Sequence, residues 1–241
     1  MSLEVFLEFK QLTSAVFVER PNRFVVRCRL GDTDELVEAH LADPGRLKEL
    51  LVPGANVYLL PADKPGRKTK WSVLLAEAPD GKTLVSVQST LANRIAEEAL
   101  RAKAVHGLED WELQRAEYSL GSSRWDFLLA GQDGKQLLLE VKSCTLVEDQ
   151  VAMFPDAVTA RGRRHLEELT ALQAAGEMEG AVLFVVQRSD AEEFRPAEHI
   201  DPAFAQALRG AVQQGVRVFV HRCAVDLTGI RWGKPIQVNL S

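Results

Sequence analysis

Three charged residues interrupt two apolar runs near the middle of the chain. The stretch RWDFLLAGQDGKQLLLEVKSC reads as two strands around a turn, with Asp126 in the first strand and Glu140 and Lys142 in the second. The three leucines before Glu140 predict a strand buried on both faces, where a solvated charge is unfavourable. The charges therefore indicate either an exposed sheet edge or a cation site, and the leucine run favours the cation site.

The turn between the two strands decides which side chains face each other. A three-residue loop over 132–134, with a type I turn followed by a left-handed glycine, would put Asp126 opposite Glu140 and Leu128 opposite Leu138. A two-residue Asp-Gly turn would instead send the two acids to opposite faces. The sequence allows both turns, and we predict the three-residue loop.

In that register the two carboxylates would have Cβ atoms roughly 5 Å apart, which is destabilising unless a positive charge offsets them. Mg²⁺ or Mn²⁺ would do so, because hard cations prefer oxygen ligands and need only one or two protein carboxylates beside water and phosphate oxygens. Lys142 lies two residues beyond Glu140, so it shares a strand face with that acid. Two acids, a lysine and a divalent cation are suited to phosphodiester hydrolysis.

The first 80 residues have the pattern of a small β-barrel, and an OB-fold is the candidate subtype. Short apolar runs alternate there with Pro-Gly, Pro-Asn and Gly-Asp turn signals. A short helix is expected over Arg46–Leu51. The predicted strands are Ser14–Val18, Phe24–Leu30, Leu36–Leu41, Val57–Leu60 and Ser72–Ala76.

Beyond the turn at Pro79–Gly81 the pattern changes to longer helices alternating with strands. We therefore predict an α+β chain with a barrel over 1–80 and an α/β domain with a mixed central sheet over 81–241. Helices are expected over Leu91–Lys103, Asp156–Ala175 and Pro202–Gln213, with Asp156 capping the second. The predicted strands are Trp111–Leu120, Arg124–Ala130, Gln136–Ser143, Ala181–Gln187 and Val216–His221.

Composition sets broad limits on the function. The 241 residues carry a net charge of −5, so any nucleic-acid surface must be a local basic patch. Three cysteines without a CxxC spacing favour buried free thiols over a disulfide framework or a zinc site. Acidic and basic residues interrupt the first 20 positions, and no run approaches the roughly 18 apolar residues of a membrane span. We expect a cytoplasmic protein without a membrane partner.

The D…E-x-K pattern on a hairpin between two helices resembles the PD-(D/E)xK nuclease superfamily. More closely, "SSRWDF", "LEVKSCTL", "STLANRIAEEAL" and "FPDAVTARGRRHLEEL" resemble the sugar fermentation stimulation protein family (SfsA). The resemblance covers nearly the whole chain and implies an OB-like domain joined to a nuclease-like domain. Asp43-Pro44 departs from the Asn-Thr that is frequent in the family.

The resemblance also implies roles for individual residues. Asp126 and Glu140 become metal ligands, Lys142 becomes the motif lysine, and Glu98 on the preceding helix matches an extra acid beside the metal. Glu98 can equally be a solvated helix residue. Arg124, in the Ser-Arg pair before Asp126, is either a phosphate contact or a surface side chain.

Further positive side chains are candidates for contact with DNA. Arg161 and His165 are four residues apart on one helix face, so both can border the cleft, although a histidine beside an apolar stripe can also be structural. Lys68 and Lys70 precede Trp71 in the barrel, a mixture of charge and aromatic that OB-folds use on nucleic-acid backbones. A solvated hairpin tip explains that mixture equally well.

Two functions follow as hypotheses. The first is a DNA-binding, Mg²⁺- or Mn²⁺-dependent nuclease, which the family resemblance links to the regulation of sugar (maltose) metabolism. The second is a DNA-binding transcriptional regulator that keeps the nuclease fold and cuts weakly or not at all. Metal-stimulated cleavage would support the first hypothesis, and cation-independent binding would support the second.

Overall fold

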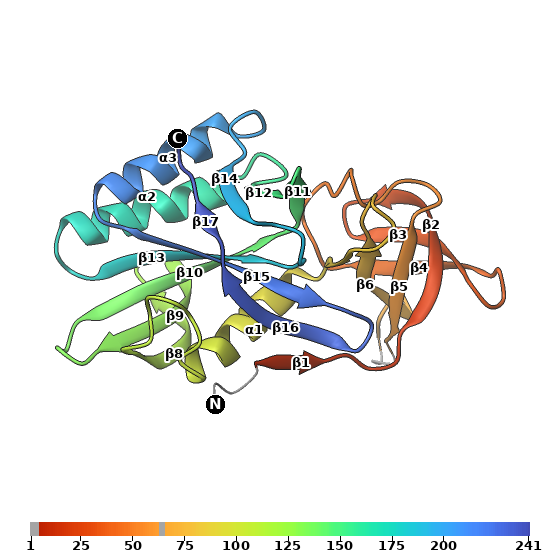
Figure 1. The fold of residues 1–241 in the computed structure, drawn as a ribbon, viewed down its shortest axis with the longest axis horizontal. Coiled ribbons are helices and arrows are strands. Elements are labelled where there is room, and N and C mark those ends of the chain that lie inside the picture. Colours follow the sequence, from red (N-terminus) through yellow and green to blue (C-terminus); the bar gives the residue numbers. More distant parts are fainter. Residues whose placement is uncertain (1–4, 63–65) are drawn as a thin grey trace.

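The computed structural model describes residues 5–62 and 66–241 and contains a β-barrel beside a layered α/β unit (Figure 1). The predicted combination of a small N-terminal barrel with a mixed-sheet domain is confirmed. The two units are in contact, so residues from both line the cleft that is described below.

Five strands form the closed barrel, in the order β4-β3-β2-β5-β6, and parallel pairing of β4 with β6 completes it. A sixth strand, β7, adds to β6. Burial alternates in the middle of β2, because one face of the strand lines the barrel core. The strands are β2 (Thr13–Asn22), β3 (Val25–Leu30), β4 (Leu36–Leu41), β5 (Asn56–Pro61), β6 (Trp71–Glu77) and β7 (Leu84–Ser86).

The helix predicted over Arg46–Leu51 is wrong. The structure has a turn there, in which the backbone N–H of Leu51 donates to the carbonyl of Leu47 (2.9 Å). Leu47 has a φ of 49°, in the left-handed region, which a right-handed helix does not accommodate. Leu47 and Leu50 are fully buried in the barrel core, so burial of these side chains outweighs the local helical preference.

The α/β unit is built on a seven-stranded mixed sheet in the order β1-β16-β15-β13-β10-β9-β8. Strand β13 runs parallel to both β10 and β15, and the other neighbours are antiparallel. Its strands are β1 (Phe6–Glu8), β8 (Trp111–Leu120), β9 (Ser123–Gly131), β10 (Gln136–Cys144), β13 (Glu179–Val186), β15 (Arg217–Val225) and β16 (Gly229–Pro235).

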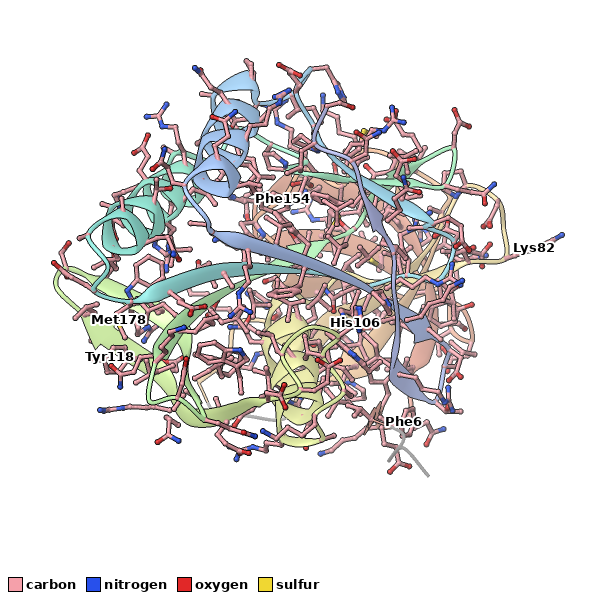
Figure 2. The ribbon with its side chains drawn as sticks, turned by 60° about the vertical axis from the view of Figure 1, so that its left-hand side comes forward. Phe6, Lys82, His106, Tyr118, Phe154 and Met178 are labelled. Carbon is pink, nitrogen blue, oxygen red and sulfur yellow. The ribbon has the colours of Figure 1, made fainter. Side chains whose placement is uncertain are left out.

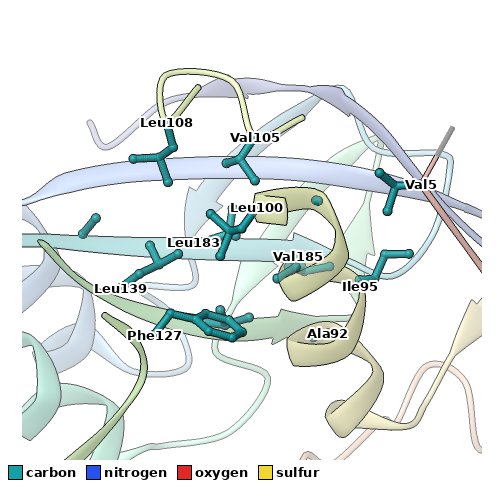
Figure 3. Packing of buried hydrophobic residues seen from close by; sticks show 14 of the residues in the cluster. Val5, Ala92, Ile95, Leu100, Val105, Leu108, Phe127, Leu139, Leu183 and Val185 are labelled. Atoms are coloured by element: carbon teal, nitrogen blue, oxygen red, sulfur yellow. The ribbon is translucent and has the colours of Figure 1, made fainter. Parts of the chain in front are cut away.

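Helices cover both faces of this sheet. Helix α1 (Ser89–Arg101) packs its apolar stripe, including Ile95, against Leu139 and Leu183 on one face (Figure 3). Helices α2 (Ala160–Ala174) and α3 (Pro202–Gln213) lie together on the other face (Figure 1). The central strands are therefore buried on both sides, as the leucine run before Glu140 predicted.

A second, four-stranded sheet in the order β11-β12-β14-β17 lies near the C-terminal ends of the central strands. Its strands have two to four residues each, too few to show a period in the sequence. They are β11 (Leu146–Glu148), β12 (Val151–Phe154), β14 (Glu193–Pro196) and β17 (Gln237–Val238). Figure 2 shows Lys82 projecting from the surface of the molecule, whereas Phe154 at the end of β12 is half-buried.

Helix α2 begins later than the sequence pattern indicated. Thr159, not Asp156, is its N-cap, and the Thr159 side chain accepts a hydrogen bond from the backbone N–H of Gly162 (3.1 Å). The carboxylate of Asp156 instead reaches the barrel, where it accepts a hydrogen bond from the backbone N–H of Leu47 (3.2 Å). The N-cap prediction for Asp156 is therefore wrong, because a contact 109 residues away in sequence takes its side chain.

Two short strands belong to the other unit than a division of the chain at residue 80 would assign them to. Strand β7 follows the turn at Pro79–Gly81 and still belongs to the barrel sheet, whereas β1 precedes the barrel and pairs with β16 of the α/β unit. The three cysteines are free and buried, as the absence of a CxxC spacing predicted.

Candidate active site

The hairpin between β9 and β10 has the predicted three-residue register. Leu128 pairs with Leu138 and Phe127 pairs with Leu139. The backbone N–H of Gly131 donates to the carbonyl of Lys135 (2.8 Å), and Gly134 takes the left-handed conformation at φ 79°. Regular pairing stops at Phe127, which leaves Asp126 and Glu140 as the next positions of the two strands.

Asp126 occupies the place where β9 separates from β10. Its Oδ2 accepts a hydrogen bond from the backbone N–H of Val141 (2.7 Å), and its Oδ1 accepts one from Nδ2 of Asn93 on helix α1 (2.5 Å). Burial, together with the negative charge of Glu140, raises the pKa of this carboxyl to about 6 against the opposing effect of these hydrogen bonds.

Glu140 is only 5% exposed and takes its partners from its own strand and from helix α2. Its Oε1 accepts a hydrogen bond from Nζ of Lys142 (2.6 Å) and lies 2.6 Å from Nδ1 of His165. Burial by itself would raise the pKa of Glu140, but the His165 hydrogen bond and the charge of Lys142 outweigh it, so this pKa lies below its ordinary value.

The two acids take partners from opposite sides of the sheet. Asn93 belongs to α1 on one face, and His165 belongs to α2 on the other. The regular alternation of β9 breaks at Asp126, because Trp125 packs in the cluster beneath α2 whereas Phe127 packs beneath α1. The break places the Asp126 carboxylate in the opening between the strands.

One oxygen of this arrangement lacks a partner. Glu140 Oε2 is buried and forms no hydrogen bond within the part of the chain that the structure describes. An unpaired buried carboxylate oxygen is unfavourable, and a divalent cation is a partner that would also offset the charge of Asp126. Within residues 5–62 and 66–241, no cluster of three His, Cys, Asp or Glu side chains is arranged to hold a metal. Two carboxylates nevertheless fit Mg²⁺, which keeps several waters.

Asp126 and Lys142 line a cleft of about 690 Å³ between the α/β unit and the barrel. Glu140 does not reach the cleft surface and lies buried behind its wall. On the barrel side, Arg23 and the loop 43–45 line the cleft, and on the opposite side helix α1 and the segment before α2 do so.

Some of the predicted DNA contacts lie at this cleft. Arg124 and Arg161 both line it and both are exposed. Arg124 also forms an ion pair with Glu117 (3.0 Å). Arg163 and Arg164, which follow on α2, are exposed and pair with the glutamates one helical turn ahead, as expected for solvated residues.

Glu98 does not join the other predicted ligands. It is exposed on α1 and does not line the cleft, whereas Asn93 and Glu97 do. Successive helix residues are about 100° apart, so the position four residues after Asn93 faces the cleft and the fifth does not. Glu97 pairs with Arg101 (2.6 Å) and is the acid that this helix offers to the cleft.

The prediction that His165 contacts a nucleic acid is corrected by its burial. Its ring is 2% exposed, lies against Glu140 and packs on Trp125 with ring centroids 5.3 Å apart. His165 therefore orients Glu140 from behind and does not reach the cleft. Lys68 and Lys70 are exposed in the segment before β6, and neither lines the cleft.

The contact of Asp156 with the barrel fixes the cleft wall. Gly45 lies so close to Asp156 that a Cβ atom at this glycine would be 2.2 Å from Oδ2 of that carboxylate. Ser89 at the start of α1 also donates to the carbonyl of Ala42 (2.7 Å). Neither contact could be inferred from the sequence, because the partners are 47 or more residues apart.

Asp43 is a buried acid in this wall, and its replacement should stabilise the protein. Burial, with a smaller contribution from Asp156, raises the pKa of Asp43 from 3.8 to about 6, against the hydrogen bond that its Oδ1 accepts from the backbone N–H of Gly45 (2.7 Å). The folded state therefore binds more protons than the unfolded state between these values, so the stabilising effect of protonation is lost as pH rises through about 6.

We expect Asp43→Asn to raise the free energy of unfolding at pH 8 by about 2–3 kcal/mol, because asparagine can still accept from Gly45 and carries no charge. The variant should gain little at pH 4. Urea unfolding at both pH values measures this, and an equal gain at pH 4 and pH 8 would contradict it. The exposed variant Asp32→Asn is the control.

Comparison with known proteins supports a family assignment. A family model described as "Sugar fermentation stimulation protein RE domain" matches residues 90–229, and one described as "SfsA N-terminal OB domain" matches residues 18–87. The chain belongs to the SfsA family. The N-terminal barrel is thus an OB domain, as predicted.

Two SfsA relatives illustrate the similarity. The sugar fermentation stimulation protein homolog of Shouchella clausii is 47% identical over 217 residues, covering 90% of this chain and 92% of the relative. The homolog of Moorella thermoacetica is 45% identical over 231 residues, covering 95% of this chain and 97% of the relative. The SfsA likeness therefore extends over both units of the fold.

A solved SfsA structure shows the same fold. The structure of Pyrococcus furiosus SfsA in complex with Ca²⁺ matches with a TM-score of 0.88 and 27% sequence identity, covering 98% of this chain and 99% of that chain. Among residues 5–62 and 66–241 of this chain, no helix has the length and apolar content needed to cross a bilayer.

Proposed function

We propose that this SfsA protein is a Mg²⁺- or Mn²⁺-dependent nuclease that hydrolyses DNA phosphodiesters. The observation that carries the proposal is the unpaired, buried Oε2 of Glu140 on the strand next to Asp126, with Lys142 lining the cleft and donating to the other oxygen of Glu140. A purely structural role would be better served by an acid whose two oxygens are both paired.

In this proposal Asp126 and Glu140 hold the cation, and the ammonium of Lys142 orients the attacking water or stabilises negative charge that develops at phosphorus. A bound divalent cation supplies Lewis-acid polarisation and charge neutralisation at the phosphate. Asn93 and His165 keep the two carboxylates in place by hydrogen bonds from opposite faces of the sheet. We propose Glu97, rather than Glu98, as an outer acid of the site.

Arginines around the cleft support an anionic polymer as substrate. Arg94 and Arg161 line the cleft and form no ion pair with any residue that the structure describes. Their positive charge is thus available for phosphate groups, and Arg124 would add a third contact if the substrate displaced Glu117. DNA phosphates would follow this rim while the scissile bond lies at Asp126.

The Ca²⁺ in the structure of Pyrococcus furiosus SfsA supports a divalent-cation site in this chain. Ca²⁺ and Mg²⁺ both take carboxylate oxygens, although Ca²⁺ accepts more ligands at longer distances. Ca²⁺ is therefore expected to bind here and to support cleavage poorly.

A panel of labelled single-stranded, duplex, flap and junction DNAs tests the proposal. With Mg²⁺ or Mn²⁺ the wild-type protein should cut at least one of them, and Glu140→Gln should reduce the rate by at least about 10²-fold. The control is Glu98→Gln, which removes the same charge from an exposed site. Activity retained by Glu140→Gln would contradict this site assignment, unless a contaminating nuclease accounts for the cleavage.

One observation favours a second function, that of a DNA-binding transcriptional regulator without cleavage. Lys142 and His165 both contact Oε1 of Glu140, so this acid already has two positive or polar partners behind the cleft wall. Such a network can be stable without a metal. Cation-independent DNA binding with no cleavage across the whole panel would support this function, and regulation of sugar metabolism would then act through binding alone.

A further inference from the structure

We propose that the OB barrel carries a binding surface for single-stranded DNA, formed by Arg20, Arg23, Phe24 and Arg46 beside the cleft. This surface rests on the proposed interaction with DNA but does not require cleavage. It differs from the barrel segment that contains Lys68 and Lys70, which lies outside the cleft lining.

Backbone carbonyl groups hold the arginines of this surface together. The guanidinium of Arg20 donates to the carbonyl of Arg46 (2.7 Å) through Nη1 and to the carbonyl of Arg23 (2.8 Å) through Nη2. Arg23 in turn donates from Nε to the carbonyl of Pro44 (2.8 Å). These contacts join the β2–β3 hairpin to the loop after β4, so the guanidinium groups of Arg20 and Arg23 are ordered before any ligand binds.

The charges of these arginines are not neutralised by ion pairs. Among residues 5–62 and 66–241, none of the three has a salt-bridge partner, and Arg23 and Arg46 are exposed. On the same barrel, by contrast, Arg27 and Arg29 each form ion pairs with acids. Arg23 and Arg46 therefore present charges without a salt-bridge partner beside the cleft, and Arg20 lies behind them near the carboxylates of Asp43 and Asp156.

An aromatic side chain stands within this group. Phe24 is 51% exposed, although it is a large apolar residue that burial would favour. Its neighbour Arg23 lines the cleft that contains Asp126. Exposed aromatics next to cations are the elements with which OB-folds stack bases and follow a phosphate backbone. The surface and the catalytic cleft are therefore continuous.

The presence of Phe24 favours a single strand over a duplex as the occupant. In a duplex, base faces are stacked on one another and are not available to a protein side chain, whereas unpaired bases offer a free face to an aromatic ring. A strand that stacks on Phe24 would place its neighbouring phosphates on the arginines and continue into the cleft.

Binding of fluorescently labelled oligo-dT of about 12 nucleotides to the full-length protein tests this surface. The titrations are done in EDTA over a series of salt concentrations, so that they report binding whether or not the protein is a nuclease. Arg23→Ala/Arg46→Ala should weaken binding about 10-fold or more and reduce the slope of log K against log salt by about 1.4.

Phe24→Ala should weaken binding by about 5-fold or more without changing the salt slope, and Phe24→Trp should retain it. The matched control is Lys10→Ala/Lys82→Ala, which removes two positive charges from exposed positions outside this surface and outside the cleft. Circular dichroism verifies that each variant is folded. Loss of binding in the lysine pair but not in the arginine pair would overturn the proposal. The proposal would also be overturned if Phe24→Ala lost equal affinity for oligo-dT and for duplex DNA.

Discussion

Asp126→Asn should abolish metal-stimulated DNA cleavage, with a rate reduction of at least about 10³-fold, and leave the folded protein at least as stable as the wild type. The activity loss is expected because a neutral amide is a poor ligand for a hard cation. The retained stability is expected because the substitution removes one of two neighbouring buried negative charges. A variant that lost activity by unfolding would show the opposite stability change.

The hydrogen bonds of Asp126 can survive this substitution. An asparagine at position 126 can accept from the N–H of Val141 through its oxygen, and Asn93 can turn its amide to accept from the new NH₂ group. Melting curves with and without Mg²⁺, Mn²⁺ or Ca²⁺ provide a readout apart from activity. The cations should raise the melting temperature of the wild type and not that of Asp126→Asn.

Asp133→Asn on the same hairpin is the control, since Asp133 is an exposed turn residue. It should keep both the cleavage rate and the thermal shift. An equal cation-induced shift in wild type and Asp126→Asn would place the cation elsewhere.

His165→Ala should destabilise the protein by about 3 kcal/mol. The substitution removes one of the two hydrogen-bond partners of the buried Glu140 carboxylate, the ring nitrogen 2.6 Å from Oε1. Only Lys142 of these two partners then remains. It also removes the ring that packs on Trp125. Urea unfolding monitored by tryptophan fluorescence and by circular dichroism measures the change. His106→Ala, at an exposed histidine that also faces a glutamate, should change stability by less than about 0.5 kcal/mol.

A double-mutant cycle separates the contact from the loss of packing. If the Glu140–His165 interaction is the main cause, His165→Ala should cost about 1–3 kcal/mol less in the Glu140→Gln background. Equal costs in both backgrounds would assign the effect to packing against Trp125. The cycle is measured without divalent cations, so it does not depend on catalysis.

The predicted hairpin register is the observed one, because Gly134 takes the left-handed position of the three-residue loop, although the sequence also allowed a two-residue turn. The direction of the Asp126 side chain could not be predicted. Its position depends on where β9 leaves β10 and on Asn93, 33 residues earlier, which approaches from the other face of the sheet. A strand period alone places Asp126 and Glu140 on one face, and tertiary contacts override it.

Helical spacing predicted which helices flank the two acids, but not which of their side chains face the cleft. It identified α1 and α2 as the helices beside the acids, but a choice between Glu97 and Glu98 requires the rotation of α1 about its axis. That rotation follows from the burial of Ile95 and its neighbours against the sheet. His165 illustrates the same limit, since its spacing from Arg161 indicated a shared face and did not reveal that α2 buries it.

The pairing of β1 with β16 has a mechanical consequence. Strand β1 belongs to the sheet of the α/β unit, the following residues form the barrel, and α1 returns to the α/β unit, so the barrel is inserted between two segments of one unit. A domain on one linker can swivel, whereas a domain anchored at both ends has little torsional freedom. We therefore expect the width of the cleft to be set by the fold rather than by hinge closure, and a single proteolytic nick in either connection to leave the barrel attached.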